Sequence, residues 1–471
     1  MIFSNTPRPE TLRSLAEVNL KPFWLEDPAR PERAPILEVK TEADLTVIGG
    51  GYTGLWTALL AKQEAPNREV ILLEAEAAGG AASGRNGGFV SASLTHSFQN
   101  GLNRWPRELN RIIEMGHRNL EGIEQSIRQY NIDCDYIRSG ELNVALEQHE
   151  IEELKELQEA SSAFGESMIF YDQEQVRSIV NSPSYLGGCF NPANGMVHPA
   201  KLAWGLRRVC LEAGVRLYEG TRAERLKPGK NSVIIQTQVG KVETRKLALA
   251  TNAFPPLLNR LSHYVLPVYD YALMTEPLTE SQRDLIGWRG REGLSDSANQ
   301  FHYYHITKDG RILWGGYDAI YYWNNGIGPH LENRPQTFSR LAEHFFQTFP
   351  QLDGLRFTHA WGGVIDTCSR YSAFWGTAMG GKAAYSLGYT GLGVGAARFG
   401  AQVMLDLLDK RKTERTALKM VRSKPVPFPP EPLRSMVVNF TRWSLAQSDR
   451  RQGRRNLWLQ LLDALGLGFD S

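Results

Sequence analysis

A glycine cluster between two apolar runs constrains the fold of this chain more than any other feature. Residues 45–48 are mostly apolar and rich in β-branched side chains, residues 49–54 fit the pattern GxGxxG, and residues 70–73 form a second apolar run that is followed by Glu74. This order predicts a strand, a helix and a second strand. Glycines at such a turn let a pyrophosphate approach the helix N-terminus, and the Glu74 carboxylate would accept hydrogen bonds from ribose hydroxyls. The sequence therefore predicts nucleotide binding, with a purely structural turn as the alternative.

Two further glycine-rich segments indicate which nucleotide is bound. Residues 79–89 combine small residues with Ser83, Arg85 and Asn86, so they offer backbone donors, a hydroxyl and a guanidinium for a second contact along a long cofactor. Residues 388–394 join a strand to another helix start, which suits the anionic edge of a reduced flavin. A glycine-rich surface loop is the alternative for residues 79–89. Together the segments favour FAD over NAD.

Composition limits the class of protein. The chain has 471 residues, 42% of them hydrophobic and 22% charged, which suits two joined globular domains. The formal net charge of +2 gives no reason to expect a nucleic-acid partner. The four cysteines form no CxxC pair, so we expect no metal site and a reducing compartment. No apolar run is long enough to span a bilayer and the first residues do not resemble a signal peptide, so we expect a cytoplasmic protein.

Several motifs together resemble the D-amino acid oxidase/glycine oxidase superfamily of flavoproteins, and most closely its γ-glutamylputrescine oxidase-like branch. The segments that carry the resemblance occur in the family's order between about residues 20 and 410: residues 49–54 with Glu74, 82–88, 249–253, 310–311 with 315–316, 361–366 and 388–394. The resemblance implies an α/β fold with a discontinuous Rossmann-like FAD-binding domain, an antiparallel-sheet substrate domain and a C-terminal helical tail. We place the FAD-binding domain at residues 1–98, 189–262 and 371–410, the substrate domain at 99–188 and 263–370, and the tail at 411–471.

The resemblance also implies which residues hold the cofactor. Some family members attach flavin through a cysteine, but Cys368 is displaced from that position, so we expect non-covalent FAD. The residues predicted to bind FAD are Gly49, Gly51, Tyr52, Thr53, Gly54, Glu74, Ala75, Ser83, Gly84, Arg85, Asn86, Gly87, Gly88, Ala223, Thr251, Asn252, Gly363, Gly388, Thr390, Gly391, Leu392, Gly393 and Val394.

The activity that the resemblance implies is oxidation of the C–N bond of a small amine or amino acid. Hydride would pass to flavin N5, the imine would be hydrolysed, and oxygen would reoxidise the flavin to give hydrogen peroxide. One alternative is a dehydrogenase that passes electrons to quinone or another carrier, and another is a catalytically silent flavin-binding subunit.

The catalytic candidates lie in residues 300–307, where family members place a tyrosine or histidine against the substrate. Strand alternation puts His302 and Tyr304 on one face and Tyr303 and His305 on the other, so the two histidines do not suit a shared zinc ion. Aromatic packing is the alternative role for each of them. Arg370 is a further candidate, because an arginine in this region of some relatives binds a substrate carboxylate. If no arginine enters the pocket, an amine without an adjacent carboxylate is the better substrate.

The tail has a different charge from the rest of the chain. Residues 411–471 carry 12 Lys/Arg and 5 Asp/Glu, whereas the preceding 410 residues carry 41 and 46. Two amphipathic stretches, residues 435–447 and 456–465, contain Trp443 and Trp458, a combination that can seat a helix on an anionic membrane. We favour docking of the basic tail, on the acidic body or on a second subunit, over such membrane contact.

Overall fold

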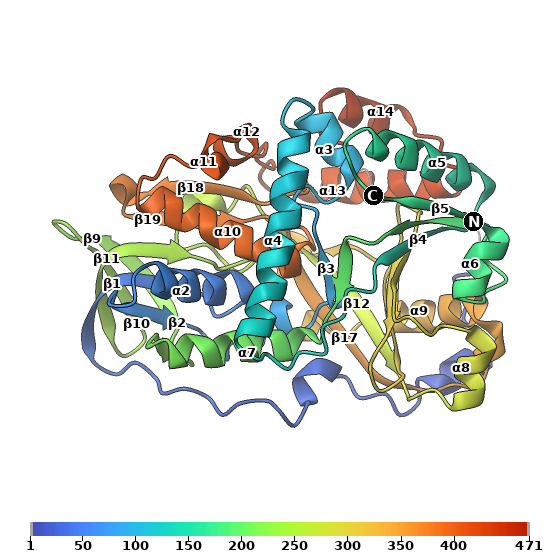
Figure 1. The fold of residues 1–471 in the computed structure, drawn as a ribbon, viewed down its shortest axis with the longest axis horizontal. Helices are drawn as coiled ribbons and strands as arrows, with labels where there is room; N and C mark the ends of the chain where they lie inside the picture. Colours follow the sequence, from blue (N-terminus) through green and yellow to red (C-terminus); the bar gives the residue numbers. More distant parts are fainter. Residues whose placement is uncertain (1–2, 469–471) are drawn as a thin grey trace.

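Two large β-sheets lie side by side in the computed structural model, which describes residues 3–468 (Figure 1). The first has eight strands in the order β18–β19–β11–β1–β2–β8, with β10 paired to β11 and β9 paired to β10. Strands β19, β11, β1, β2 and β8 run parallel to one another, whereas β18 pairs antiparallel with β19. The strands of this sheet are β1 (Lys40–Ile48), β2 (Val70–Leu73), β8 (Arg216–Tyr218), β9 (Ala223–Pro228), β10 (Val233–Thr237), β11 (Lys241–Leu249), β18 (Phe374–Ala378) and β19 (Ala383–Leu387).

Both faces of the first sheet are covered, as its uninterrupted apolar strands require. In β2, Val70 and Leu72 pack into one cluster of buried side chains, and Ile71 and Leu73 pack into another on the opposite face. Three helices contribute many of the side chains of the first cluster: α2 (Tyr52–Glu64), α7 (Pro199–Glu212) and α10 (Gly393–Leu408). The predicted strand–helix–strand unit is therefore confirmed as β1, α2 and β2.

The second sheet has nine strands in the order β16–β12–β15–β14–β13–β4–β6–β5, with β17 paired to β12. It is antiparallel, as predicted, except that β13 and β4 run parallel. Its strands are β4 (Glu141–Ala145), β5 (Ile169–Asp172), β6 (Gly187–Asn191), β12 (Leu266–Thr275), β13 (Gly293–Asp296), β14 (His302–Ile306), β15 (Ile312–Gly316), β16 (Ile320–Tyr321) and β17 (Phe357–Thr367). A separate ribbon pairs β3 (Phe89–Ser91) with β7 (Asn194–Met196).

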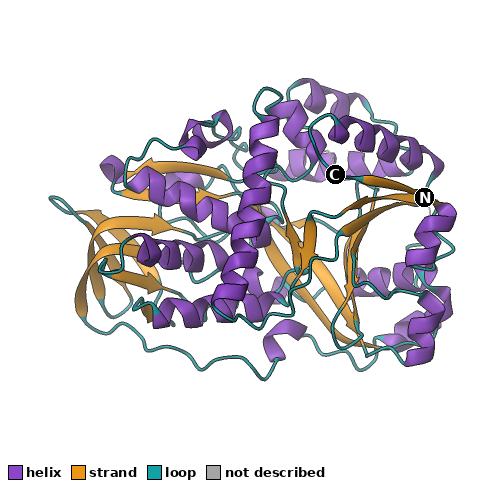
Figure 2. Cartoon of the chain, in the orientation of Figure 1, coloured by secondary structure: helices purple, strands orange, loops and turns teal. Residues whose placement is uncertain are grey.

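Helices surround both sheets (Figure 2). Besides α2, α7 and α10 they are α1 (Pro9–Ser14), α3 (Phe98–Arg104), α4 (Leu109–Gln129), α5 (Gln148–Ser162), α6 (Gln173–Ile179), α8 (Glu280–Ile286), α9 (Pro335–Thr348), α11 (Glu414–Ala417), α12 (Lys419–Arg422), α13 (Leu433–Asp449) and α14 (Leu457–Ala464). Within residues 3–468, no helix is long and apolar enough to cross a membrane.

Two elements do not follow the predicted domain boundaries. Helix α4 falls in a segment assigned to the substrate domain, yet its apolar side belongs to the same buried cluster as α2 and α10. Strand β6 pairs along its length within the second sheet, although the predicted boundary between residues 188 and 189 divides it. The division of the chain into two domains otherwise stays a prediction.

The tail packs on the body of the protein, as predicted, and carboxylates of the tail make hydrogen bonds at both ends of α13. Near the start of α13, the Glu431 carboxylate accepts a hydrogen bond from the Tyr321 hydroxyl at 2.6 Å. At the other end of the helix, the Asp449 carboxylate accepts from the backbone N–H groups of Asn299 and Gln300, each at 3.0 Å. The red helices α13 and α14 lie over the second sheet in Figure 1.

Candidate cofactor and substrate site

The turn between β1 and α2 is built by glycines that no other residue can replace without a shift of backbone. Gly49 has a φ of +109°, and a Cβ there would lie 2.3 Å from the carbonyl oxygen of Ala250. A Cβ on Gly54 would lie 1.8 Å from the carbonyl oxygen of Gly49. Helix α2 therefore packs directly on the end of β1, and its N-terminus, whose first N–H groups have no partner within the helix, faces the cavity.

Glu74 follows β2 and fixes the same turn. One carboxylate oxygen accepts from the Gly50 N–H at 2.6 Å and the other from the Glu76 N–H at 2.8 Å. Burial raises the pKa of Glu74. Its carboxylate lines the cavity beside the glycine turn, the position that ribose recognition requires, and each oxygen has a further lone pair to offer.

The second glycine-rich segment lies against the first. The Ser83 hydroxyl accepts from the Tyr52 N–H at 2.9 Å, which joins the two loops at the start of α2. The Asn86 side chain stabilises its own loop, because its amide oxygen accepts from the Gly88 N–H at 2.8 Å. Arg85 is held by an ion pair with Glu332 at 2.6 Å, so its guanidinium connects the loop to a segment of the other half of the molecule.

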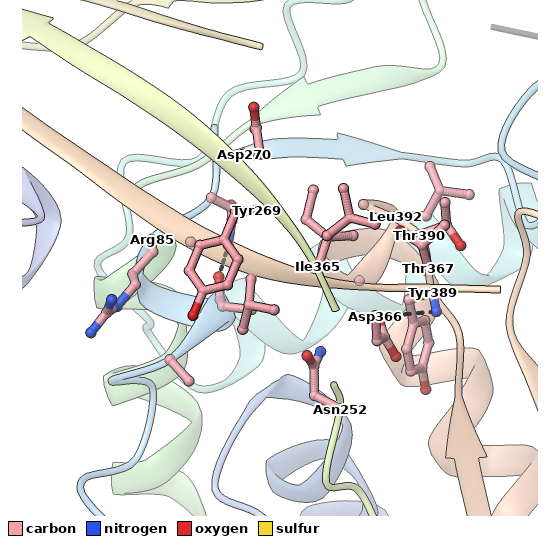
Figure 3. A pocket seen from close by; sticks show the side chains of 18 of the residues that line it. Arg85, Asn252, Tyr269, Asp270, Ile365, Asp366, Thr367, Tyr389, Thr390 and Leu392 are labelled. Carbon is pink, nitrogen blue, oxygen red and sulfur yellow. Dashed lines mark hydrogen bonds between the residues drawn. The ribbon is translucent and has the colours of Figure 1, made fainter. Parts of the chain in front are cut away.

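Asp366 positions the third glycine-rich segment, and sequence reasoning assigned it no role. Its buried carboxylate accepts from the backbone N–H groups of Gly388 at 2.7 Å and Tyr389 at 3.2 Å (Figure 3). Burial raises the pKa of Asp366 to about 7. Asp366 is the last residue of the motif at 361–366 that contributed to the family resemblance, and this motif was the sequence feature that could have indicated its role. Asp366 shapes the turn that leads into α10.

All three segments border one cavity of about 1910 Å³. Of the residues predicted to bind the cofactor, Gly54, Gly84, Gly88 and Gly388 do not line it; they allow close packing behind its wall. For example, a Cβ on Gly88 would lie 2.3 Å from the carbonyl oxygen of Val197. The cavity is lined by Gly49, Gly51, Tyr52, Thr53, Glu74, Ala75, Ser83, Arg85, Asn86, Gly87, Ala223, Thr251, Asn252, Gly363, Thr390, Gly391, Leu392, Gly393 and Val394.

The second sheet also borders this cavity, and Tyr303 of β14 is one of its lining residues. Its hydroxyl donates to the Asp270 carboxylate at 2.5 Å, and both residues line the cavity. Its ring is held between two backbones, since a Cβ on Gly87 or on Gly315 would come within 2.7 or 2.6 Å of ring atoms. Burial raises the pKa of Asp270 to about 6. The ring of Tyr303 thus lies between a cofactor loop and the second sheet.

The other candidates on β14 do not line the cavity. His302 bonds to Asp296 at 2.7 Å and to His344 at 2.9 Å, and the Tyr304 hydroxyl bonds to that of Tyr185 at 2.8 Å. His305 shares the Tyr303 face, where both rings contact Phe89, but it lies behind the cavity wall. The predicted alternation is confirmed, and of the four candidates the geometry favours Tyr303.

Arg370 does not fit the predicted role of a carboxylate clamp. Its side chain is buried, and its guanidinium donates to the carbonyl oxygens of Ala373, Met420 and Ser423, the last two at 3.0 Å. It also does not line the cavity. Its partners fix the segment that leads into the tail, so the donors that a substrate would need are already occupied.

Comparison with known proteins identifies the family. Residues 44–407 match the family model DAO, described as FAD dependent oxidoreductase. The chain belongs to the DAO family. It is 29% identical over 373 residues to gamma-glutamylputrescine oxidoreductase of Escherichia coli K12, covering 78% of this chain and 83% of that protein. It is 24% identical over 402 residues to the probable oxidoreductase OrdL of Haemophilus influenzae, covering 83% and 88%. The crystal structure of glycine oxidase from Geobacillus kaustophilus superposes with a TM-score of 0.65 at 17% identity, covering 79% and 96%.

The cavity fits the FAD that the DAO family requires. The α2 N-terminus offers N–H groups for a pyrophosphate, and the Glu74 carboxylate lies where a ribose would follow. At the third glycine-rich segment, a Cβ on Gly391 or Gly393 would meet no atom within 4 Å, so the cavity has open space beside the start of α10. The protein is therefore an FAD-dependent oxidoreductase of a family whose members act on amines and amino acids.

Cys368 lies behind the cavity wall, which supports non-covalent FAD. Its Sγ is buried, lies 3.2 Å from the Ser372 carbonyl oxygen, and does not line the cavity. Burial raises the pKa of the thiol, which disfavours the nucleophilic thiolate. We predict that acid precipitation leaves all flavin in the supernatant, for the wild-type protein and for Cys368→Ser alike. A yellow wild-type pellet that becomes colourless in Cys368→Ser would contradict this.

Proposed function

We propose that the protein oxidises the C–N bond of a small amine, with hydrolysis of the resulting imine and with oxygen as the final electron acceptor. FAD, when bound, supplies the two-electron acceptor for the hydride. The observation that carries the proposal is that the Tyr303–Asp270 pair borders the same cavity as the three cofactor segments. Substrate and cofactor would therefore meet without a separate channel.

Tyr303 and Asp270 are suited to orient the amine. Above the pKa of Asp270, about 6, the carboxylate accepts hydrogen bonds from the Tyr303 hydroxyl and has lone pairs left for an amine N–H. Hydride loss requires the neutral amine, so the task of these residues is to hold it and to exclude water, and no strong base is needed. The apolar part of the wall here includes the ring of Tyr269.

The substrate class follows from the position of Arg370. Because its guanidinium is bound to backbone carbonyls, it is not offered to a carboxylate on the reacting carbon. This supports an amine over an α-amino acid. The similarity to gamma-glutamylputrescine oxidoreductase, named for an amine of this kind, points in the same direction.

A cytoplasmic location is the other part of the proposal. Cys134, Cys189, Cys210 and Cys368 are all free and buried, as suits a reducing compartment.

The test is anaerobic bleaching of the bound flavin by a panel of amines and amino acids. We predict bleaching by amines, and a bleaching rate about tenfold lower in Tyr303→Phe, because a hydrogen bond that orients the substrate site is lost. Tyr304→Phe is the matched control, since Tyr304 lies next to Tyr303 on the opposite face of β14. Its rate should equal that of the wild-type protein.

Readmission of air separates the alternatives. Rapid return of the flavin colour, with hydrogen peroxide, supports the oxidase. Slow return that quinone accelerates would indicate a dehydrogenase. No bleaching by any member of the panel would contradict the proposal and leave a silent flavin-binding subunit.

A further inference from the structure

One wall of the cavity comes from the tail, beyond the residues that match the family model. Helix α13 contributes Val437, Val438, Thr441, Arg442 and Leu445 to the lining. These positions follow the spacing i, i+1, i+4, i+5, i+8, so they form one continuous face of the helix. The match to the DAO model ends at residue 407, so this wall is an addition to the shared fold.

Both ends of α13 are fixed to segments that themselves line the cavity. Near its start, the Glu431 carboxylate accepts from the Tyr321 hydroxyl at 2.6 Å and from the Asn324 N–H at 3.2 Å. At its end, the Asp449 carboxylate accepts from the side-chain amide of Asn299 at 2.6 Å and from the Gln300 N–H at 3.0 Å. Tyr321, Asn299 and Gln300 border the cavity, so α13 spans between two parts of its rim.

Arg442 is the charged residue on the inner face of α13. Its guanidinium has one weak hydrogen bond, to the Ala319 carbonyl oxygen at 3.4 Å, and no carboxylate within the described part of the chain forms an ion pair with it. Asp318, the acid whose negative charge acts on Arg442, is already bound by Arg340 at 2.6 Å and by the Thr337 hydroxyl at 2.7 Å. Arg442 therefore faces the cavity with most of its donors unused.

The surroundings of Arg442 increase its tendency to bind an anion. Burial, together with the positive charges of Arg334 and Arg340, lowers the pKa of Arg442, while Asp318 opposes this shift. Despite this lowered pKa, the guanidinium of Arg442 keeps its proton, so it remains positively charged in a partly desolvated environment. An anion that entered the cavity would neutralise it and fill its planar donors, and a carboxylate matches their geometry.

We propose that α13 is the specificity-determining wall of this enzyme and that Arg442 binds a carboxylate carried by the substrate amine at a distance from the reacting carbon. The inference rests on the proposed amine oxidation. Within the described chain, Arg442 forms no hydrogen bond with Tyr303 or Asp270, which are the residues that would hold the amine itself. A substrate that reached both would carry an amine at one end and an anionic group at the other.

The experiment compares ω-amino carboxylates of four to eight carbons with the carboxamides of the same length. Dissociation constants are measured from the perturbation of the flavin spectrum in the anaerobic holoenzyme, which needs no turnover. The wild-type protein should prefer the carboxylate in at least one pair. In Arg442→Gln, that preference should fall roughly 10- to 100-fold, the range for a lost charge-assisted bond, with the carboxamide affinity unchanged.

Two further variants control for charge and for folding. Arg442→Lys keeps the charge and should retain part of the preference. Arg451→Gln removes an exposed arginine that does not line this cavity, and it should behave as the wild-type protein does. Equal affinity for both members of every pair in the wild-type protein would overturn the inference, as would an unchanged preference in an Arg442→Gln protein of normal melting temperature. Absence of bleaching by every amine contradicts the proposed function instead.

Discussion

Gly54→Ala should abolish flavin binding and lower the free energy of unfolding by about 3 kcal/mol or more. The added Cβ would lie 1.8 Å from the Gly49 carbonyl oxygen, and the obstacle is backbone that no rotamer change can move. Overpacking in a close-packed interior costs roughly 1–3 kcal/mol even where side chains can adjust. Relief requires α2 to move away from β1, and that movement displaces the N–H groups that would bind the pyrophosphate. The measurements are flavin content after purification and the thermal melting curve.

Gly393→Ala is the matched control. Gly393 is the first residue of α10 and also lines the cavity, but a Cβ there would meet nothing within 4 Å. The melting temperature of the apoprotein should therefore stay at the wild-type value. If Gly54→Ala retained flavin at the wild-type level, α2 would not be the pyrophosphate site.

Deleting the chain after Lys424 should lower the melting temperature by several degrees and promote aggregation. The deletion removes Leu459, which is buried, and the inner face of α13, so the cavity would open to solvent. A fully buried Leu or Val side chain contributes roughly 1.5–3 kcal/mol, and newly exposed apolar surface promotes association. Differential scanning calorimetry and light scattering of the truncated and full-length proteins provide the comparison.

The outer face of α13 supplies the control for the deletion. Met436 is 64% exposed and Trp443 is 53% exposed, so replacing both by glutamine should leave the melting temperature unchanged. If the tail instead attached the protein to a membrane, replacing these outward residues would weaken vesicle binding. Deleting the tail would then leave the melting temperature of the body unchanged. Sedimentation of the full-length protein with anionic vesicles, together with a truncated protein of unchanged stability, would contradict docking as the main role of the tail.

The cofactor half of the site could be predicted because its signals are local. A strand, a glycine turn and a helix follow one another within residues 40–64, and the chemistry of each is set by its neighbours in sequence. The same is true of Glu74, which ends the next strand. The alternation of side chains along a strand also predicted correctly that Tyr303 lies on the opposite face of β14 from His302 and Tyr304. It did not indicate which face meets the cavity, because that depends on the packing of His302 against His344 of α9, 42 residues away.

The roles of Arg370 and Arg442 depend on distant parts of the chain. Two of the carbonyl groups that bind Arg370, those of Met420 and Ser423, lie 50 and 53 residues further on, and nothing near residue 370 signals them. Arg442 lies in a tail whose sequence suggests only a basic amphipathic helix. Its position at the cavity follows from the hydrogen bonds at both ends of α13, which form between segments more than 100 residues apart. Tertiary contacts of this kind leave no pattern in one sequence.

The path of the tail also limits how the molecule can open. The chain leaves the helix layer of the first sheet at the end of α10 and is then fastened, through Glu431 and Asp449, to the rim of the second sheet. A hinge motion that moved the two sheets apart would have to break the hydrogen bonds of both Glu431 and Asp449. We therefore expect small molecules to enter and leave through local movement of side chains and loops, without separation of the two sheets.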